Sequence, residues 1–166
     1  MNNKRKDSMM AQLHNATTLS IQEFLMAHTL RSKLIGVWQL VSFDFVPEDG
    51  SPNYPGFGPN PIGQLTYTET GYVTAQLGSK DRTEQDSSQT LLDKYLAYAG
   101  TFEVDETSQC VTHFVDMSLF PNWLGIPQPR LARLTQDELE LTTGTPITVA
   151  GKLGTGTLLW HRAKPV

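Results

Sequence analysis

The first third of the chain contains a strongly β-prone segment, Leu34-Ile-Gly-Val-Trp-Gln-Leu-Val-Ser-Phe-Asp-Phe-Val46. Its Trp, Phe and β-branched residues suit the pleated, half-buried surface of a β-strand. A segment of the same character, Thr155-Gly-Thr-Leu-Leu-Trp-His-Arg162, lies close to the end of the chain. We expect these two segments to be neighbouring strands that close a single β-barrel.

Short β-prone segments alternate with turn residues between these two strands. The pattern predicts six further strands, at 63–68, 72–77, 98–104, 110–118, 128–134 and 138–142. Short strands at regular spacing are typical of a sandwich or a barrel, and eight strands in hairpin-like succession fit a barrel that can hold one small ligand. The predicted fold class is therefore all-β, an eight-stranded up-and-down antiparallel barrel.

The segments outside the strands divide into a tail, a helix and loops. Residues 1–16 are polar and are interpreted as a flexible tail, which leaves residues 17–166 as a single barrel domain. A capping-box pattern begins at Ser20 and predicts a helix over 20–33 that could close one end of the barrel. The Gly- and Pro-rich segment 47–61 is a loop, with a movable lid and a rigid surface loop as equal alternatives.

Composition and charge narrow the class of partner. The chain has 166 residues and a formal net charge of −4, which argues against nucleic acid because phosphate binding needs a basic face. No hydrophobic run approaches the length of a membrane span, and the first residues lack the apolar core of a secretory signal. The one cysteine, Cys110, cannot form an internal disulfide. We therefore expect a cytoplasmic protein that binds neither nucleic acid nor membrane, and the sequence leaves a homodimer open.

Four longer stretches carry a resemblance to a known family. They are Gly58-Pro-Asn-Pro-Ile-Gly63, Tyr95-Leu-Ala-Tyr-Ala-Gly-Thr-Phe-Glu-Val104, Val111-Thr-His-Phe-Val115 and Ser118-Leu-Phe-Pro-Asn-Trp123. Together with Gly36-Val-Trp38 and Arg162, they resemble the small microbial and fungal lipocalin-like domain proteins. The resemblance implies an eight-stranded calyx with an internal site for a hydrophobic small molecule. It also implies that cofactor-free cyclase or isomerase chemistry is open, since some lipocalin-like proteins of natural-product pathways have it.

Few residues qualify as catalytic candidates. The four histidines show no paired metal-ligand spacing, and the chain has no phosphate loop, dinucleotide fingerprint or serine-nucleophile elbow. We therefore expect neither a metal nor a cofactor. His113 shares a strand face with Val111, Val115 and Met117, so it could donate, accept or transfer a proton if that face lines a cavity. The alternative is a core histidine that is hydrogen-bonded to a neighbour.

Arg130 is the second catalytic candidate. Alternation along the strand puts Arg130 and Arg133 on opposite faces, so one of them should point inward, depending on the register. An inward arginine needs a carboxylate, a phenolate or a ligand oxygen as its partner. Glu103 and Asp116 on preceding strands are candidate partners. The alternative places both arginines at the barrel rim.

The remaining candidates either orient a ligand or hold the fold. Those expected to contact the ligand are Tyr67, Tyr72, Gln76, Tyr98, Glu103, Met117, Phe120 and Trp123, the last two at the cavity mouth. Trp38 and Trp160 are expected to be structural residues at the closed end, where Arg162 covers Trp38 by cation–π stacking.

Two classes of function stay open on these residues. A cofactor-independent isomerase or cyclase would hold an apolar substrate in a reactive conformer while His113, Arg130 or a tyrosine polarises a carbonyl. A non-catalytic carrier would bind the same kind of molecule unchanged. The absence of a disulfide and of a recognisable signal favours the enzyme, because secreted carriers of this architecture usually have both.

Overall fold

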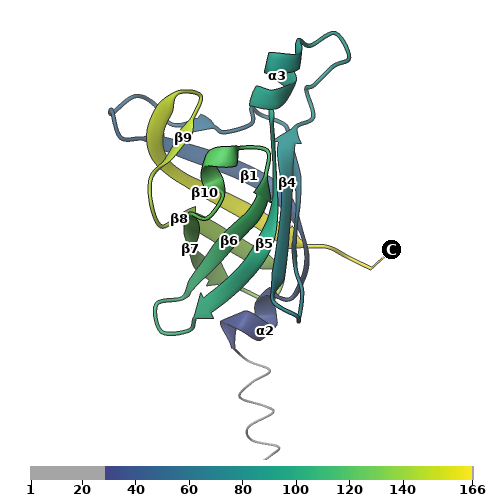
Figure 1. Ribbon diagram of the computed structural model, residues 1–166, viewed down its shortest axis with the longest axis vertical. Coiled ribbons are helices and arrows are strands. Elements are labelled where there is room, and N and C mark those ends of the chain that lie inside the picture. The colour runs from purple at the N-terminus through teal and green to yellow at the C-terminus, as the bar shows by residue number, and fades with distance from the viewer. Residues whose placement is uncertain (1–28, 166) are drawn as a thin grey trace, which may run out of the picture.

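The computed structural model describes residues 29–165 and confirms the predicted eight-stranded antiparallel barrel (Figure 1). The barrel strands are β1 (Gly36–Pro47), β3 (Pro61–Tyr67), β4 (Tyr72–Ser79), β5 (Tyr95–Asp105), β6 (Cys110–Ser118), β7 (Pro127–Leu134), β8 (Glu138–Thr143) and β10 (Lys152–Arg162). The shorter elements are α2 (Leu30–Leu34), β2 (Tyr54–Pro55), α3 (Ser88–Asp93), the 3-10 helix η1 (Pro121–Trp123) and β9 (Ile147–Val149).

Pairing between β1 and β10 closes the barrel, as the two end segments predict. The register runs from Trp38 opposite Arg162 to Pro47 opposite Gly154. All the other barrel strands pair with their neighbours in chain order, except that β10 follows β8 across the β9 hairpin. Closure satisfies the backbone groups of strands that would otherwise be open edges.

Two short strands, β2 and β9, are not predicted from the sequence. β2 lies inside the Gly- and Pro-rich segment 47–61 and pairs with Asp44 and Phe45 of β1. β9 forms a hairpin with the first residues of β10. Strands of two or three residues are too short to show the period-2 alternation that identifies a strand. Figure 1 shows β9 at the end of the barrel opposite α2.

The other end of the barrel is closed by α2 together with Trp38 and Arg162. Trp38 is fully buried, and its indole Nε1 donates a hydrogen bond of 2.8 Å to the Leu34 carbonyl. The Arg162 guanidinium lies 4.1 Å from the centre of the Trp38 ring. It also donates to the carbonyl oxygens of Lys33 and Ile35. The predicted cation–π contact at the closed end is therefore present, and it binds the last strand to the chain around α2.

The helix expected over 20–33 falls mostly outside the described residues, which begin at Thr29. The described helix, α2, has Thr29 as its N-cap, and the hydroxyl oxygen accepts the Ser32 N–H at 3.1 Å. The Glu106 carboxylate, from the turn between β5 and β6, accepts the first two backbone N–H groups of α2. These N–H groups have no partner within a helix, so Glu106 ties α2 to the barrel.

A β-bulge in β6 changes which side chains face the interior. Ala99 pairs with Met117 and Gly100 pairs with Val115, so Asp116 is an extra residue in β6. A bulge shifts the alternation of side chains by one position. Gly100 suits this crossing because a Cβ atom there would collide with a backbone carbonyl of β6.

We expect Trp38→Ala to lower the free energy of unfolding by about 3–5 kcal/mol, as large-to-small changes of buried aromatic residues do. The change removes a fully buried ring, its hydrogen bond to α2 and the surface under Arg162. Chemical denaturation followed by circular dichroism measures the loss. Val37→Ala, at the more exposed neighbouring position, is the matched control and should cost far less. Equal losses in the two variants would contradict the assignment of Trp38 to the closed end.

Candidate functional site

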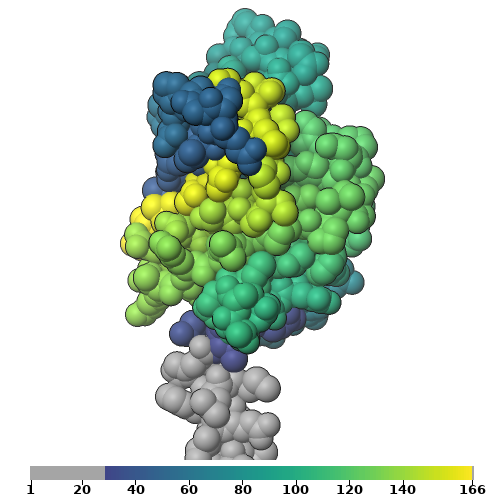
Figure 2. Space-filling model, turned by 90° about the vertical axis from the view of Figure 1, so that its left-hand side faces the viewer, coloured from purple at the N-terminus to yellow at the C-terminus, as the bar shows by residue number. Residues whose placement is uncertain are grey.

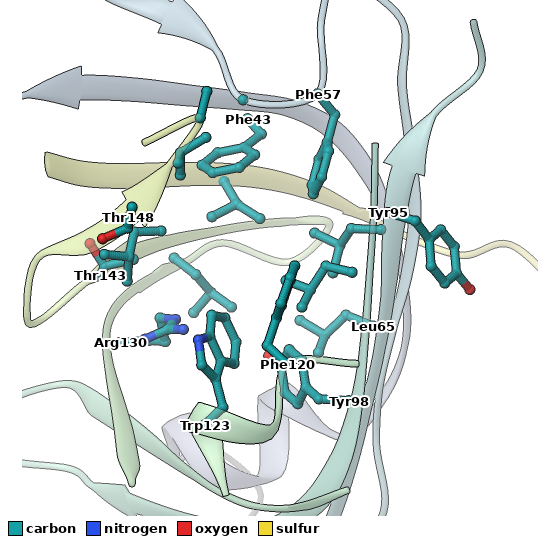
Figure 3. A pocket seen from close by; sticks show the side chains of 18 of the residues that line it. Phe43, Phe57, Leu65, Tyr95, Tyr98, Phe120, Trp123, Arg130, Thr143 and Thr148 are labelled. Atoms are coloured by element: carbon teal, nitrogen blue, oxygen red, sulfur yellow. The ribbon is translucent and has the colours of Figure 1, made fainter. Parts of the chain in front are cut away.

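The barrel encloses a cavity of about 390 Å³ that opens at the end opposite α2 (Figure 3). Its walls are mainly apolar side chains from the inward faces of the strands. They include Phe43, Phe57, Leu65, Leu77, Leu96, Phe120, Trp123, Leu141, Leu158 and Trp160. Only a few polar side chains, above all Tyr98, His113, Arg130 and Thr143, interrupt this surface. An apolar cavity with a few polar groups is the usual form of a small-molecule site.

Three segments surround the mouth of the cavity, namely the chain after β2, the β9 hairpin and η1. The Tyr54 hydroxyl donates to the Val149 carbonyl at 2.8 Å and so joins the β2 segment to β9. The Phe57 ring packs on Phe43, with ring centres 5.4 Å apart. Figure 2 shows the segment around β2, in blue, against the yellow strands β9 and β10. Movement of the 47–61 loop as a lid stays a prediction.

His113 forms the centre of a buried hydrogen-bonded network. Its Nε2 lies 2.7 Å from the Tyr67 hydroxyl, and its Nδ1 lies 2.9 Å from the Tyr98 hydroxyl. Tyr67 comes from β3, Tyr98 from β5 and His113 from β6, so three strands meet in this network. Tyr98 and His113 line the cavity, and Tyr67 lies behind them with 1% exposure. The two alternatives for His113 are thus combined, since it is a satisfied core histidine at a cavity wall.

Burial and charge set the protonation states of the network. Burial, with a further contribution from the Arg130 charge, lowers the pKa of His113 to about 3, so the ring is neutral near pH 7. Burial raises the pKa of Tyr67 and Tyr98, and the Arg130 charge opposes this rise at both hydroxyls. Both tyrosines therefore keep their protons, and the network consists of neutral hydrogen-bonding groups beside one cation.

Arg130 is that cation, and it is the inward member of the two arginines on β7. It is 6% exposed, and Figure 3 shows its guanidinium turned towards the cavity. Its Nη1 donates to the Pro129 carbonyl at 2.9 Å, and its Nη2 lies 3.5 Å from Gln128 Oε1. Within residues 29–165 it forms no salt bridge. Burial lowers its pKa, and the nearby tyrosines oppose that effect. A guanidinium nevertheless keeps its proton in proteins.

The partners predicted for Arg130 need correction. Glu103 and Asp116 are both exposed and neither forms an ion pair with Arg130. Glu103 follows the buried Phe102 on β5, so alternation turns it outward. Asp116 is the extra residue of the bulge. Arg133, the outward arginine, lies 3.6 Å from Glu140 on the barrel surface.

The structure brings together only part of the predicted ligand site. Tyr98, Phe120 and Trp123 line the cavity with His113 and Arg130, and the rings of Tyr98 and Trp123 are 5.7 Å apart. Trp160, expected only at the closed end, borders the cavity too. Its indole Nε1 is buried without a hydrogen-bond partner in the described part of the chain.

Five predicted ligand contacts are corrected because their side chains lie outside the cavity lining. Tyr67 is buried behind Tyr98 and His113, and Tyr72, Gln76, Glu103 and Met117 are exposed. Tyr72 and Gln76 occupy the outward phase of β4, whose inward phase is Val73, Ala75 and Leu77. Met117 is turned out by the bulge that precedes it and is 68% exposed.

Other cavity residues were not predicted from the sequence. They are the apolar wall, from Phe43 and Leu77 to Leu141 and Leu158, and the β9 hairpin from Ile147 to Gly151. The alternation of Leu139, Leu141 and Thr143 on β8 was a usable signal for the wall. The β9 hairpin had no comparable signal, because only its place in the fold brings it to the mouth.

Two features are not found in the described residues. No helix between residues 29 and 165 is long and apolar enough to cross a membrane. No group of three or more His, Cys, Asp or Glu side chains in this part of the chain is placed to hold a metal ion.

The low pKa of His113 predicts an acid-dependent loss of stability. Below pH 6.5 His113 binds a proton in the unfolded state, whereas in the folded state it stays neutral down to about pH 3. The contribution of neutral His113 to the free energy of unfolding is therefore full above pH 6.5, and it falls as the pH decreases towards 3. Between pH 6.5 and about 4.5, where most carboxylates stay ionised, we expect a loss of about 2 kcal/mol in the wild type.

Equilibrium denaturation at several pH values tests this expectation in wild type, His113→Gln and His161→Gln. The His113→Gln variant should be less stable at neutral pH but should lose less stability over the same pH window. His161→Gln, at an exposed histidine that pairs with Glu138, is the control for the loss of any one histidine. An unchanged slope in His113→Gln would contradict a neutral, buried His113.

Comparison with known proteins agrees with the barrel and its cavity. Residues 35–163 match the lipocalin-like domain family. A protein of Aspergillus oryzae (strain ATCC 42149 / RIB 40), named as a 4'-hydroxy-3'-methoxypropiophenone carrier protein, is 36% identical to this chain over 74 residues. The similarity covers 41% of this chain and 67% of that relative. With a closed eight-stranded barrel and a family match over most of its length, the chain belongs to the lipocalin-like domain family.

Proposed function

We propose that this protein binds and carries a small, mainly apolar molecule that has an oxygen-bearing polar end. The observation that carries the proposal is the apolar cavity with the buried, ion-pair-free Arg130 in its wall. A volume of about 390 Å³ lies at the lower end of the range of about 300–1,000 Å³ for small-molecule sites. The cavity therefore suits a compact ligand, such as one aromatic ring with short substituents.

Similarity to the Aspergillus oryzae protein supports an aromatic ketone as the ligand class. The ligand in that protein's name is an aryl ethyl ketone that also bears a hydroxyl and a methoxy group. In our chain, the lining residues Phe120, Trp123 and Leu158 would pack on the ring. An oxygen atom of the ligand, from its ketone or its hydroxyl group, would accept hydrogen bonds from Arg130 and Tyr98.

Filling the cavity should weaken binding strongly if the ligand lies inside the barrel. We expect 4'-hydroxy-3'-methoxypropiophenone to bind the wild type and to bind Leu158→Trp at least tenfold more weakly, because the larger side chain occupies the cavity. Isothermal titration calorimetry measures both affinities. Leu131→Trp makes the same change on the outer face of β7, where Leu131 is 51% exposed, and should bind as the wild type does. Equal binding by all three proteins would exclude the cavity as the site.

A cofactor-independent isomerase or cyclase is the second candidate function. The observation that favours it is that Arg130 and Tyr98 both line the cavity and that the Arg130 charge acts on the Tyr98 hydroxyl. Fixed donors of this kind can stabilise the negative charge that develops on a carbonyl oxygen during enolisation. Because the pKa of His113 is near 3, His113 would act by orienting Tyr98 and would be a weak proton acceptor at neutral pH. The catalytic role then belongs to Arg130 and Tyr98.

Product analysis separates the two functions. Wild-type protein is incubated with the ligand that it binds, and the recovered molecule is compared with the original by chiral chromatography and mass spectrometry. An enzyme should change the ligand, and Arg130→Met should slow the change by roughly 10²–10³-fold, as the loss of one oxyanion donor does. Arg133→Met, on the outer face, should not. Recovery of unchanged ligand from a wild type that binds it supports the carrier and rejects the enzyme for that ligand.

A further inference from the structure

We propose that the cavity selects its ligand as an oxygen anion, the ionised form of an acidic hydroxyl such as a phenol, held by Arg130 and Tyr98. This inference rests on the proposed function and names the chemical form of the ligand. It follows from Arg130 and Tyr98, which border the cavity with hydrogen-bond donors still unused; the unpartnered indole N–H of Trp160 is a further donor among the lining residues. The charge of Arg130 and the proton position of Tyr98 both favour an anion.

The first observation is the charge on Arg130. A guanidinium has five N–H donors, and only two hydrogen bonds from Arg130 to other described residues are found, one of them long at 3.5 Å. The groups whose charges act on Arg130 are Tyr67, Tyr98 and Cys110, and none of them is a carboxylate. The cavity wall at Arg130 is therefore positive, and within residues 29–165 no carboxylate is paired with it.

A neutral ligand would leave the positive charge of Arg130 even less compensated. It would displace the water in the cavity that can solvate the guanidinium, and it would bring no opposite charge. An isolated charge in an apolar surrounding is strongly disfavoured, whereas an ionised oxygen would pair with Arg130 and accept charge-assisted hydrogen bonds. Among the described residues, Asp93 is the one carboxylate that borders the cavity, and it is an exposed residue of α3 near the mouth.

The second observation is the hydrogen-bonding pattern around His113. A neutral imidazole has one donor nitrogen and one acceptor nitrogen, so one tyrosine must donate to the ring and the other must accept from it. If Nε2–H donated to Tyr67, the hydroxyl proton of Tyr67 would need an acceptor. The described structure offers none beyond His113 itself, and Tyr67 is 1% exposed and lies outside the cavity lining.

The opposite tautomer leaves no such buried donor. Tyr67 then donates to Nε2, and Nδ1–H donates to the Tyr98 hydroxyl oxygen. The Tyr98 proton is left to bond elsewhere, and Tyr98 is the tyrosine of the network that borders the cavity. Because a buried donor without a partner is costly, we assign this arrangement. It leaves the Tyr98 proton available to a ligand, and the Arg130 charge acts on the same hydroxyl.

The test is a titration of the probe 4-hydroxyacetophenone, free and bound to the wild-type protein. The phenolate absorbs at longer wavelength than the phenol, so absorbance reports the ionised fraction. An opposite charge within reach lowers the pKa of an acidic group by about 1–3 units, so the bound phenol should ionise at least about one unit below the free phenol. The methyl ether, 4-methoxyacetophenone, cannot ionise and should bind at least tenfold more weakly, with no pH dependence between pH 6 and about 9.

Variants assign the effect to the named residues. Arg130→Met should remove the shift, and Arg133→Met, which changes the outer arginine of the same strand, should retain it. Tyr98→Phe keeps the ring and the charge of Arg130 but removes one donor, so it should reduce the shift without removing it. Tyr98→Phe also keeps the test decisive if Arg130→Met does not fold.

Failure of this inference can be distinguished from failure of the proposed function. If both probes bind equally, or if the bound phenol ionises at or above the pH of the free phenol, the cavity binds neutral ligands and the inference is overturned. The carrier function would survive that result. If neither probe binds to the wild type at millimolar concentration, both the proposed ligand class and this inference are overturned.

Discussion

The pairing of β1 with β10 closes the sheet into a barrel. It fixes the inward phase of every barrel strand, because each strand is in register with the next around the closed sheet. At one end, Trp38, Arg162 and α2 close the barrel with buried surface and hydrogen bonds to carbonyl groups. At the other end the strands end in loops and leave a cavity. The stable end and the ligand end are thus separated along the barrel axis.

Some polar groups in the interior lower the stability of the fold but suit the binding of a ligand. A barrel filled with apolar side chains would be easier to stabilise than one that buries Arg130 without a carboxylate. The Tyr67–His113–Tyr98 network lies close enough to Arg130 for its charge to act on all three groups. None of these groups supplies a negative charge at neutral pH. Such groups lower stability, and their position at an internal cavity is expected where a ligand supplies the hydrogen bonds and the opposite charge that the protein does not.

The fold could be predicted from the sequence more fully than the site. Strands of six or more residues show their alternation, and Trp38 with Arg162 identify the closed end. His113, Arg130 and Tyr98 could be selected because polar groups on apolar strand faces are unusual. Tyr72 and Gln76 were misplaced although Val73, Ala75 and Leu77 marked the inward face of β4. Met117 could not be placed, because a one-residue bulge leaves no mark in a single sequence.

A structure of the protein with 4-hydroxyacetophenone bound would show whether Arg130 and Tyr98 hold the ligand inside the barrel. We expect the aromatic ring inside the barrel between the apolar walls. We expect the phenol oxygen within about 3 Å of both the Arg130 guanidinium and the Tyr98 hydroxyl. A ligand that lies on the outer face of the barrel, or one inside the cavity with its oxygen directed away from Arg130, would contradict a site at these two residues.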